Sequence, residues 1–127
     1  MHPLAQAAAL LAALIHGWFF LMESVWFMRP RVWARFGLAT QEQAAIVRSF
    51  AWNQGFYNLF LAIGVGVGLG LMARGNTVAG EAVTLFACGS MAAAGIMLFL
   101  YNHRFLGAAL IQAVPPIVAI IAAWRML

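Results

Sequence analysis

The sequence predicts an all-α protein, a four-transmembrane-helix bundle with both termini on the extracytoplasmic side. Three observations predict it: the composition, four long apolar runs and the placement of the arginines. Of 127 residues, 65% are hydrophobic and only 8% are charged, and the mean hydropathy is +0.93. Soluble globular domains are far more polar, so an integral membrane protein is indicated. Because lipid offers the backbone no hydrogen bonds, such long apolar runs are expected to be helices.

Four apolar runs are long enough to span a bilayer, for which about 20 residues suffice. We expect one membrane domain over residues 1–127, with spans at about 4–28, 44–72, 80–101 and 105–124. Pro3 suits the first turn of a helix, and Pro30 ends the first span. Residues 40–43, TQEQ, form a capping box that starts the second span.

The arginines set the expected orientation. One side of the bundle carries five of the seven basic residues: Arg29, Arg31, Arg35, Arg48 and Arg104. The opposite side carries Arg74 and Arg125. Since cytoplasmic connections are enriched in basic residues, the first side is expected to face the cytoplasm. We therefore predict a multi-pass protein of the bacterial cytoplasmic (inner) membrane, in contact with membrane lipid.

Several function classes are disfavoured by the composition. The arginines are spread along the chain and form no clustered basic face, so nucleic-acid binding is not expected. Cys88 is the single cysteine, which excludes an intramolecular disulfide and a cysteine-based metal site. No metal site is predicted.

Glycines in the second span predict close helix packing. Its sequence IGVGVGLG holds two overlapping pairs spaced four apart, Gly64 with Gly68 and Gly66 with Gly70. Small residues let helix backbones approach closely in lipid. The expected facing surface in the third span consists of Gly89, Ala93 and Gly95.

The strongest functional indication is the first span, whose segment LLAALIHGWFFLMESVWFMR carries two ionisable side chains, His16 and Glu23. They lie nearly two helical turns apart, on one face and about 10 Å from each other along the axis. Ionisable groups at membrane depth are costly and usually mark a functional site in the bundle interior. We predict a catalytic pair, with Glu23 as acid and His16 as its partner or base.

The second span brings four polar side chains onto one broad face: Asn53, Gln54, Tyr57 and Asn58. Because an unpaired amide in hydrocarbon costs several kcal/mol, this face is expected to meet the polar face of the first span. Depths counted along the helices give a shallow tier of Glu23, Asn53 or Gln54, and Gln112. They also give a deeper tier of His16, Asn58 and Tyr57. The pocket walls are expected to include Trp18, Trp26, Trp52 and several phenylalanines.

The chain also resembles a known family. The stretches that carry the resemblance are HGWFFLMESVWF, then FGL at 36–38, NQGFYNLFLAIG at 53–64, AAG at 93–95 and QAVPPI at 112–117. They are similar to the small bacterial membrane proteins grouped as domain of unknown function 1304. The resemblance implies a four-helix membrane protein with no settled activity. It maps the family's motif residues onto His16, Glu23, Asn53, Gln54, Tyr57, Asn58 and Gln112. Pro116 departs from the small residue expected there.

These residues support several functions. The first is an intramembrane pocket that binds a small lipophilic ligand, with acid/base isomerisation, epoxide opening or cyclisation as its chemistry and no cofactor. The alternative is a proton-coupled exporter or binding protein of the small-multidrug-transporter type. A structural subunit whose polar groups join the helices, or haem binding through His16, remains open, as does a homodimer or homotrimer.

Overall fold

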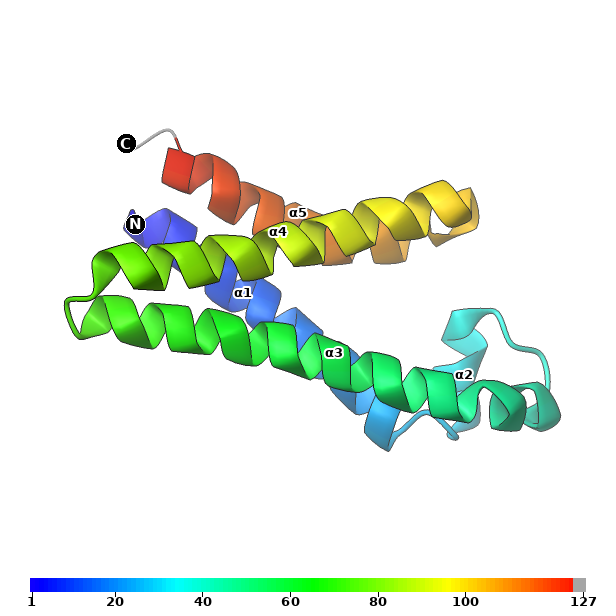
Figure 1. Cartoon of the computed structure of the whole chain (residues 1–127). Helices are drawn as coiled ribbons and strands as arrows, with labels where there is room; N and C mark the ends of the chain where they lie inside the picture. The colour runs from blue at the N-terminus through cyan, green and yellow to red at the C-terminus, as the bar shows by residue number, and fades with distance from the viewer. Residues whose placement is uncertain (125–127) are drawn as a thin grey trace. The chain divides into compact units, whose positions relative to one another are not determined.

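The structure is a computed structural model that describes residues 1–124 (Figure 1). Its long elements are α1 (Pro3–Phe20), α3 (Gln41–Ala73), α4 (Thr77–Tyr101) and α5 (Leu106–Trp124). A π-helical turn, η1 (Leu21–Val25), continues α1. Short helices occupy the connections: α2 (Pro30–Trp33), η2 (Ala34–Phe36) and η3 (His103–Phe105).

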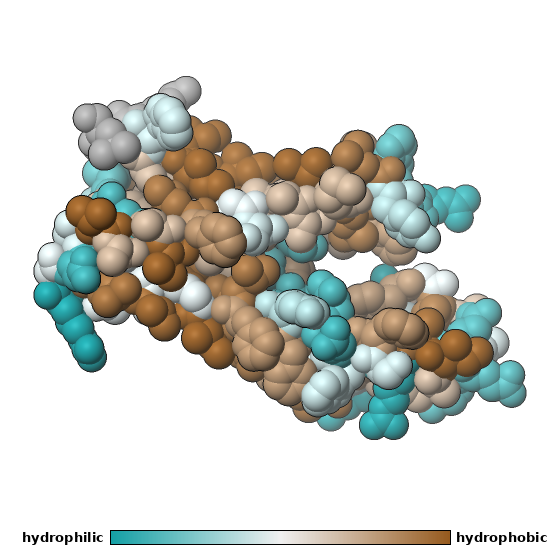
Figure 2. Space-filling view, viewed as in Figure 1, coloured by the Kyte–Doolittle hydropathy of each residue, from teal (hydrophilic) through white to brown (hydrophobic). Residues whose placement is uncertain are grey.

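Four helical segments are long and apolar enough to cross a membrane: Pro3–Val25, Gln41–Ala73, Thr77–Tyr101 and His103–Trp124. This confirms the all-α prediction and the four spanning helices. Large apolar side chains such as Leu14 and Phe86 are exposed on them, as expected of surfaces that face lipid. On the face that Figure 2 shows, apolar residues cover most of the helix surfaces, and hydrophilic ones gather near the helix ends and in a smaller patch between them. Arg125, part of the arginine count, lies outside the described residues.

The first span differs from its prediction. Regular α-helix ends at Phe20, and the Trp26 N–H donates to the Leu21 carbonyl over 2.8 Å, a bond across five residues. The helical span therefore continues through η1 to Val25, three residues before its expected end at about Met28. The start of α3 agrees with the capping box, since Thr40 Oγ1 accepts from the Gln43 N–H at 3.2 Å.

The chain divides into two compact units. The first contains Met1–Ile15 and the chain from Leu61 onward, and the second contains His16–Phe60. Helices α1 and α3 each contribute residues to both.

The first unit has a core of small side chains. Its buried residues are Ala8, Ala9, Ala12, Ala13, Val65, Ala87, Cys88, Met91 and Ala119. Helices α4 and α5 lie side by side in this unit (Figure 1). Gly95 of α4 faces α5, where a Cβ would come within 2.8 Å of the Ala113 Cβ. Because the side chains are small, the helix backbones approach closely.

Only one of the two glycine pairs packs against α4. A Cβ on Gly68 would lie 2.7 Å from the Gly80 carbonyl oxygen, and one on Gly64 would lie 3.6 Å from the Ala87 Cβ. Gly66 and Gly70 have nothing within 4 Å of an added Cβ. The packing is thus confirmed, but its expected facing surface is wrong.

The turn between α3 and α4 explains the register. Gly75 has a φ of 87°, a left-handed conformation that glycine adopts without strain, and it reverses the chain. In the resulting antiparallel pair, residues at similar distances from the turn lie opposite each other. Gly68 therefore meets Gly80, and the predicted surface around Gly95 lies too far along α4.

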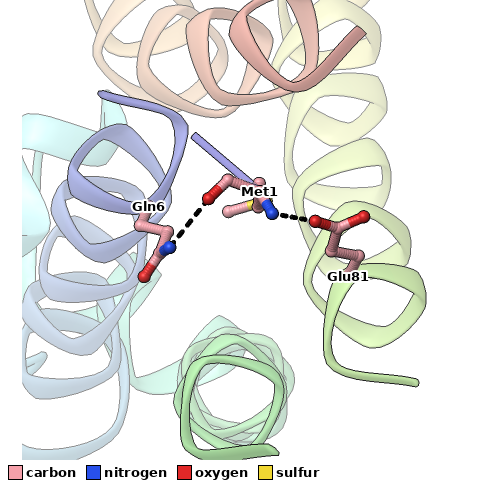
Figure 3. Close-up of polar contacts among 3 residues, drawn as sticks. All are labelled: Met1, Gln6 and Glu81. Carbon is pink, nitrogen blue, oxygen red and sulfur yellow. Dashed lines mark hydrogen bonds and ion pairs between the residues drawn. The ribbon is translucent and has the colours of Figure 1, made fainter. Parts of the chain in front are cut away.

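Glu81 ties the start of the chain to α4 in this unit. Its carboxylate pairs with the Met1 amino group, and Gln6 Nε2 donates to the Met1 carbonyl oxygen at 2.8 Å (Figure 3). Because α4 begins at Thr77, Glu81 lies beyond its first turn, where the expected effect of the helix dipole is weak. Glu81 thus has a structural role.

The glycine register predicts opposite effects for two neighbouring substitutions. Gly68→Ala should lower the free energy of unfolding by about 1–3 kcal/mol, because the methyl group meets the backbone of α4. Gly66→Ala should leave it unchanged or raise it by up to about 1 kcal/mol, through better helix propensity. Reversible unfolding in mixed micelles measures both. Equal effects of the two substitutions would contradict this register.

Candidate functional site

The site centres on the carboxyl group of Glu23, in the π turn η1. Asn58 lies in the part of α3 that belongs to the same unit, and its Nδ2 donates to Glu23 Oε2 at 2.6 Å. Asn58 is buried, with 4% of its surface exposed, while Glu23 is half-buried. A buried amide is costly unless it is hydrogen-bonded, so this contact satisfies Asn58 and fixes one carboxyl oxygen.

A close crossing of η1 and α3 positions the carboxyl group. Ser24 Oγ donates to the Trp52 carbonyl oxygen at 2.7 Å. A Cβ on Gly55 would lie 3.0 Å from the Ser24 backbone nitrogen and 3.1 Å from the Glu23 Cβ. Only glycine fits there without displacing η1. The crossing therefore places Glu23 beside Asn58, which lies nearly one helical turn beyond Gly55.

Glu23 opens onto a pocket of about 510 Å³ that lies entirely in the second unit. The pocket is lined by Glu23, Phe27, Phe36, Leu38, Val47, Phe50, Ala51, Asn53 and Gln54. Its polar groups are thus one carboxyl and two amides. The Phe27 and Phe36 rings meet edge to face with centroids 5.6 Å apart, which is a favourable aromatic geometry.

The connection between η1 and α3 supplies one wall of this pocket. Gly37, with a φ of 79°, ends η2 in a left-handed conformation and redirects the chain so that Leu38 follows Phe36 along the pocket. Glycine is required here because other residues rarely adopt this φ.

Two arginines near the site contact other groups. Arg35 Nη1 lies 3.9 Å from Met22 Sδ, and the Arg29 guanidinium lies over the Trp26 ring, 5.2 Å from its centroid. Neither arginine is among the residues that line the pocket. Within residues 1–124, the charged group of this pocket is the Glu23 carboxyl.

Asn58 departs from its predicted place. It was expected beside His16 in a deeper tier, but it hydrogen-bonds Glu23. The depth count assumed straight helices with aligned depths, whereas η1 adds a residue to its turn and crosses α3 at Gly55. Asn53 and Gln54 line the pocket together with Glu23, as the shallow tier predicted.

His16, the predicted base, lies outside the set of pocket-lining residues. It is fully buried, and its ring meets Phe19 edge to face with centroids 5.4 Å apart. Gln112 lies in α5, in the first unit, and is half-buried.

The aromatic side chains predicted to contact a ligand are not among the residues that line this pocket. Tyr57 is 57% exposed and Trp52 is 53% exposed, and Trp52 packs against Phe56 with ring centroids 4.6 Å apart. Trp26 meets Trp18 edge to face at 5.4 Å. None of these four rings, those of Trp18, Trp26, Trp52 and Tyr57, lines the pocket.

The walls contain phenylalanines, as expected, but the prediction from sequence did not specify which ones, and it did not include the crossing of η1 and α3. Phe27, Phe36 and Phe50 line the pocket, and Ser24 with Gly55 forms the crossing. Two indications were present: the FGL stretch carries Phe36 and Leu38, and Gly55 stands within the NQG sequence. Both stretches are among those that carry the family resemblance.

No cluster of three or more His, Cys, Asp or Glu side chains that could hold a metal ion occurs in the described part of the chain. The side chains at the pocket suit hydrogen bonding and proton exchange.

Comparison with known proteins identifies a family. The chain matches the model of the family described as protein of unknown function (DUF1304) over residues 10–124. No curated protein and no solved structure matches the chain.

The crossing predicts that Gly55→Ala destabilises the second unit. The new methyl group would press on the Ser24 backbone and the Glu23 Cβ, so the free energy of unfolding should fall by about 1–3 kcal/mol. Gly17→Ala is the matched control, since an added Cβ there meets nothing within 4 Å. Reversible unfolding in mixed micelles compares the two. A loss for Gly17→Ala as large as that for Gly55→Ala would contradict the proposed role of the crossing.

Proposed function

Because the chain belongs to the DUF1304 family, which is described only as proteins of unknown function, we propose a role from the chemistry of its pocket. The protein binds a small lipophilic molecule by a polar head group at Glu23, and this carboxyl exchanges a proton with the molecule or its surroundings. The observation that carries the proposal is the Glu23 carboxyl, held by Asn58 at 2.6 Å and opening onto an aromatic pocket.

The size and lining of the pocket support a small-molecule ligand. Small-molecule sites usually enclose about 300–1,000 Å³, with mostly apolar walls and a few placed polar groups. Here the phenylalanines take up the apolar part of a ligand. Asn53 and Gln54 each offer a carbonyl acceptor and an NH₂ donor beside the carboxyl. A molecule with one polar end satisfies both parts.

We place this pocket in the cytoplasmic half of a bacterial cytoplasmic membrane. The support is the charge of the adjoining connection, which carries Arg29, Arg31 and Arg35 and is expected inside by the positive-inside rule. Both termini then lie on the extracytoplasmic side. Ligands would enter from the inner leaflet of the membrane.

Acid catalysis at the same pocket is a second candidate, favoured by the two amides beside the carboxyl. An amide NH₂ could hold a carbonyl, hydroxyl or epoxide oxygen while Glu23 donates a proton to it, as general acid catalysis requires. Isomerisation, epoxide opening or cyclisation could each begin with this proton transfer to a ligand oxygen. His16 does not line the pocket, so Glu23 alone would act as the acid.

Glu23→Gln tests the binding role directly. Glutamine keeps an oxygen that can accept from Asn58, but it has no charge and no exchangeable carboxyl proton. Organic extracts of purified protein, analysed by mass spectrometry, should show a co-purifying lipophilic molecule that falls at least about tenfold in this variant, as loss of a charged partner predicts. Glu42→Gln, which changes an exposed carboxyl at the start of α3, should leave it unchanged.

Identical extracts from wild type and Glu23→Gln would contradict the proposed binding. Once a molecule is identified, its conversion by protein in detergent would indicate an enzyme. Binding without conversion, with proton-coupled movement in sealed vesicles, would indicate an exporter.

A further inference from the structure

The charge of the pocket limits the kind of head group that it accepts. Glu23 is the one ionisable side chain among the nine residues that line it. Arg29 and Arg35 contact Trp26 and Met22 respectively, outside the pocket lining. An anionic ligand would therefore bring a second negative charge close to Glu23, with no cation in the lining to offset it. Like charges in a site of low dielectric repel strongly, so an acidic head group is disfavoured.

Aromatic side chains favour the opposite charge. Phe27, Phe36 and Phe50 line the same pocket as the carboxyl. The face of an aromatic ring carries a negative quadrupole that attracts a cation within about 6 Å of the ring centroid. Quaternary ammonium groups are often recognised in this way, by several rings together with a carboxylate. A carboxylate and aromatic walls without a basic residue thus match a positively charged head group.

The amides near Glu23 also suit a cationic head group. The Asn58 NH₂ group donates to Glu23 Oε2, so the carboxylate form already accepts one hydrogen bond. The carbonyl oxygens of Asn53 and Gln54 can accept from ammonium N–H groups. Each polar group of the lining can therefore interact favourably with a cation.

We propose that the ligand of this pocket is a lipophilic cation, an amine or ammonium group on an apolar body, which pairs with the Glu23 carboxylate between the side chains of Phe27, Phe36 and Phe50. This inference rests on the proposed function and adds the chemical class of the head group. It also favours the exporter over the enzyme, because a carboxyl that holds a cation does not at the same time donate a proton to it.

A pair of probes that differ only in charge tests the proposal. Benzyltrimethylammonium carries the cation, and neopentylbenzene replaces its nitrogen by carbon with the same shape. Binding of each to the full chain in lipid nanodiscs is measured by saturation-transfer NMR and titration. Wild type should bind the cation at least about tenfold more tightly than the hydrocarbon, as pairing with a carboxylate and aromatic faces predicts.

Two variants test whether the preference for the cationic probe comes from the Glu23 carboxylate and from the aromatic ring of Phe50. Glu23→Gln should abolish the difference between the probes. Phe50→Leu keeps an apolar side chain but removes the ring, so it should weaken the cation about threefold or more and change the hydrocarbon little. Phe86→Leu is its control: Phe86 is 76% exposed and Phe50 is 77% exposed, but Phe86 lies outside the pocket. Glu42→Gln is the control for Glu23→Gln.

The outcomes separate this inference from the proposed function. If both probes bind equally in wild type and Phe50→Leu weakens both, the pocket binds lipophilic molecules but its preference for cations is wrong. If neither probe binds above the level of empty nanodiscs, the cation proposal is overturned for this chain. If, in addition, Glu23→Gln retains every co-purifying molecule, the proposed function fails as well.

Discussion

The interaction on which the site depends is the hydrogen bond between Asn58 and Glu23. A carboxyl and an amide within apolar helices are each costly when unpaired, and here they satisfy one another at 2.6 Å. The bond forms only because η1 approaches α3 closely enough at Gly55, where the lack of a side chain leaves room for Ser24. A hydrogen bond from Ser24 to the Trp52 carbonyl holds the same crossing. The position of the Glu23 carboxyl thus depends on the close approach of the η1 and α3 backbones.

The π turn has a direct consequence for this geometry. A single turn of π-helix adds one residue and is common at functional sites. In this protein it covers Leu21–Val25 and therefore contains both Glu23 and Ser24. A regular α-helix would have turned the side chains after it by a different angle. The irregularity lies at the two residues that contact α3, Glu23 through Asn58 and Ser24 through the Trp52 carbonyl.

The two units use small residues in different ways. In the first, alanines and the glycines Gly68, Gly80 and Gly95 let whole helices pack closely, and among the described residues Met91 is the largest buried side chain of the core. In the second, Gly55 permits one crossing, and phenylalanines around it leave a pocket of about 510 Å³. Small residues therefore close the interior of one unit and, with large aromatic neighbours, help to form a pocket in the other.

The sequence alone determined the fold class and the four spans, because apolar runs are a property of residue type and spacing. It also singled out Glu23 as a candidate, because a buried charge is costly. It also placed Asn53 and Gln54 near Glu23, because counting residues along a regular helix is reliable over short distances. Tertiary structure decided that Asn58 pairs with Glu23 and that Gly68 meets Gly80. It also decided which phenylalanines line the pocket, namely Phe27, Phe36 and Phe50, and that Trp26 and Trp52 do not. These outcomes depend on a π turn, a chain reversal and a crossing point, and each is set by contacts between segments that periodicity along one helix does not encode.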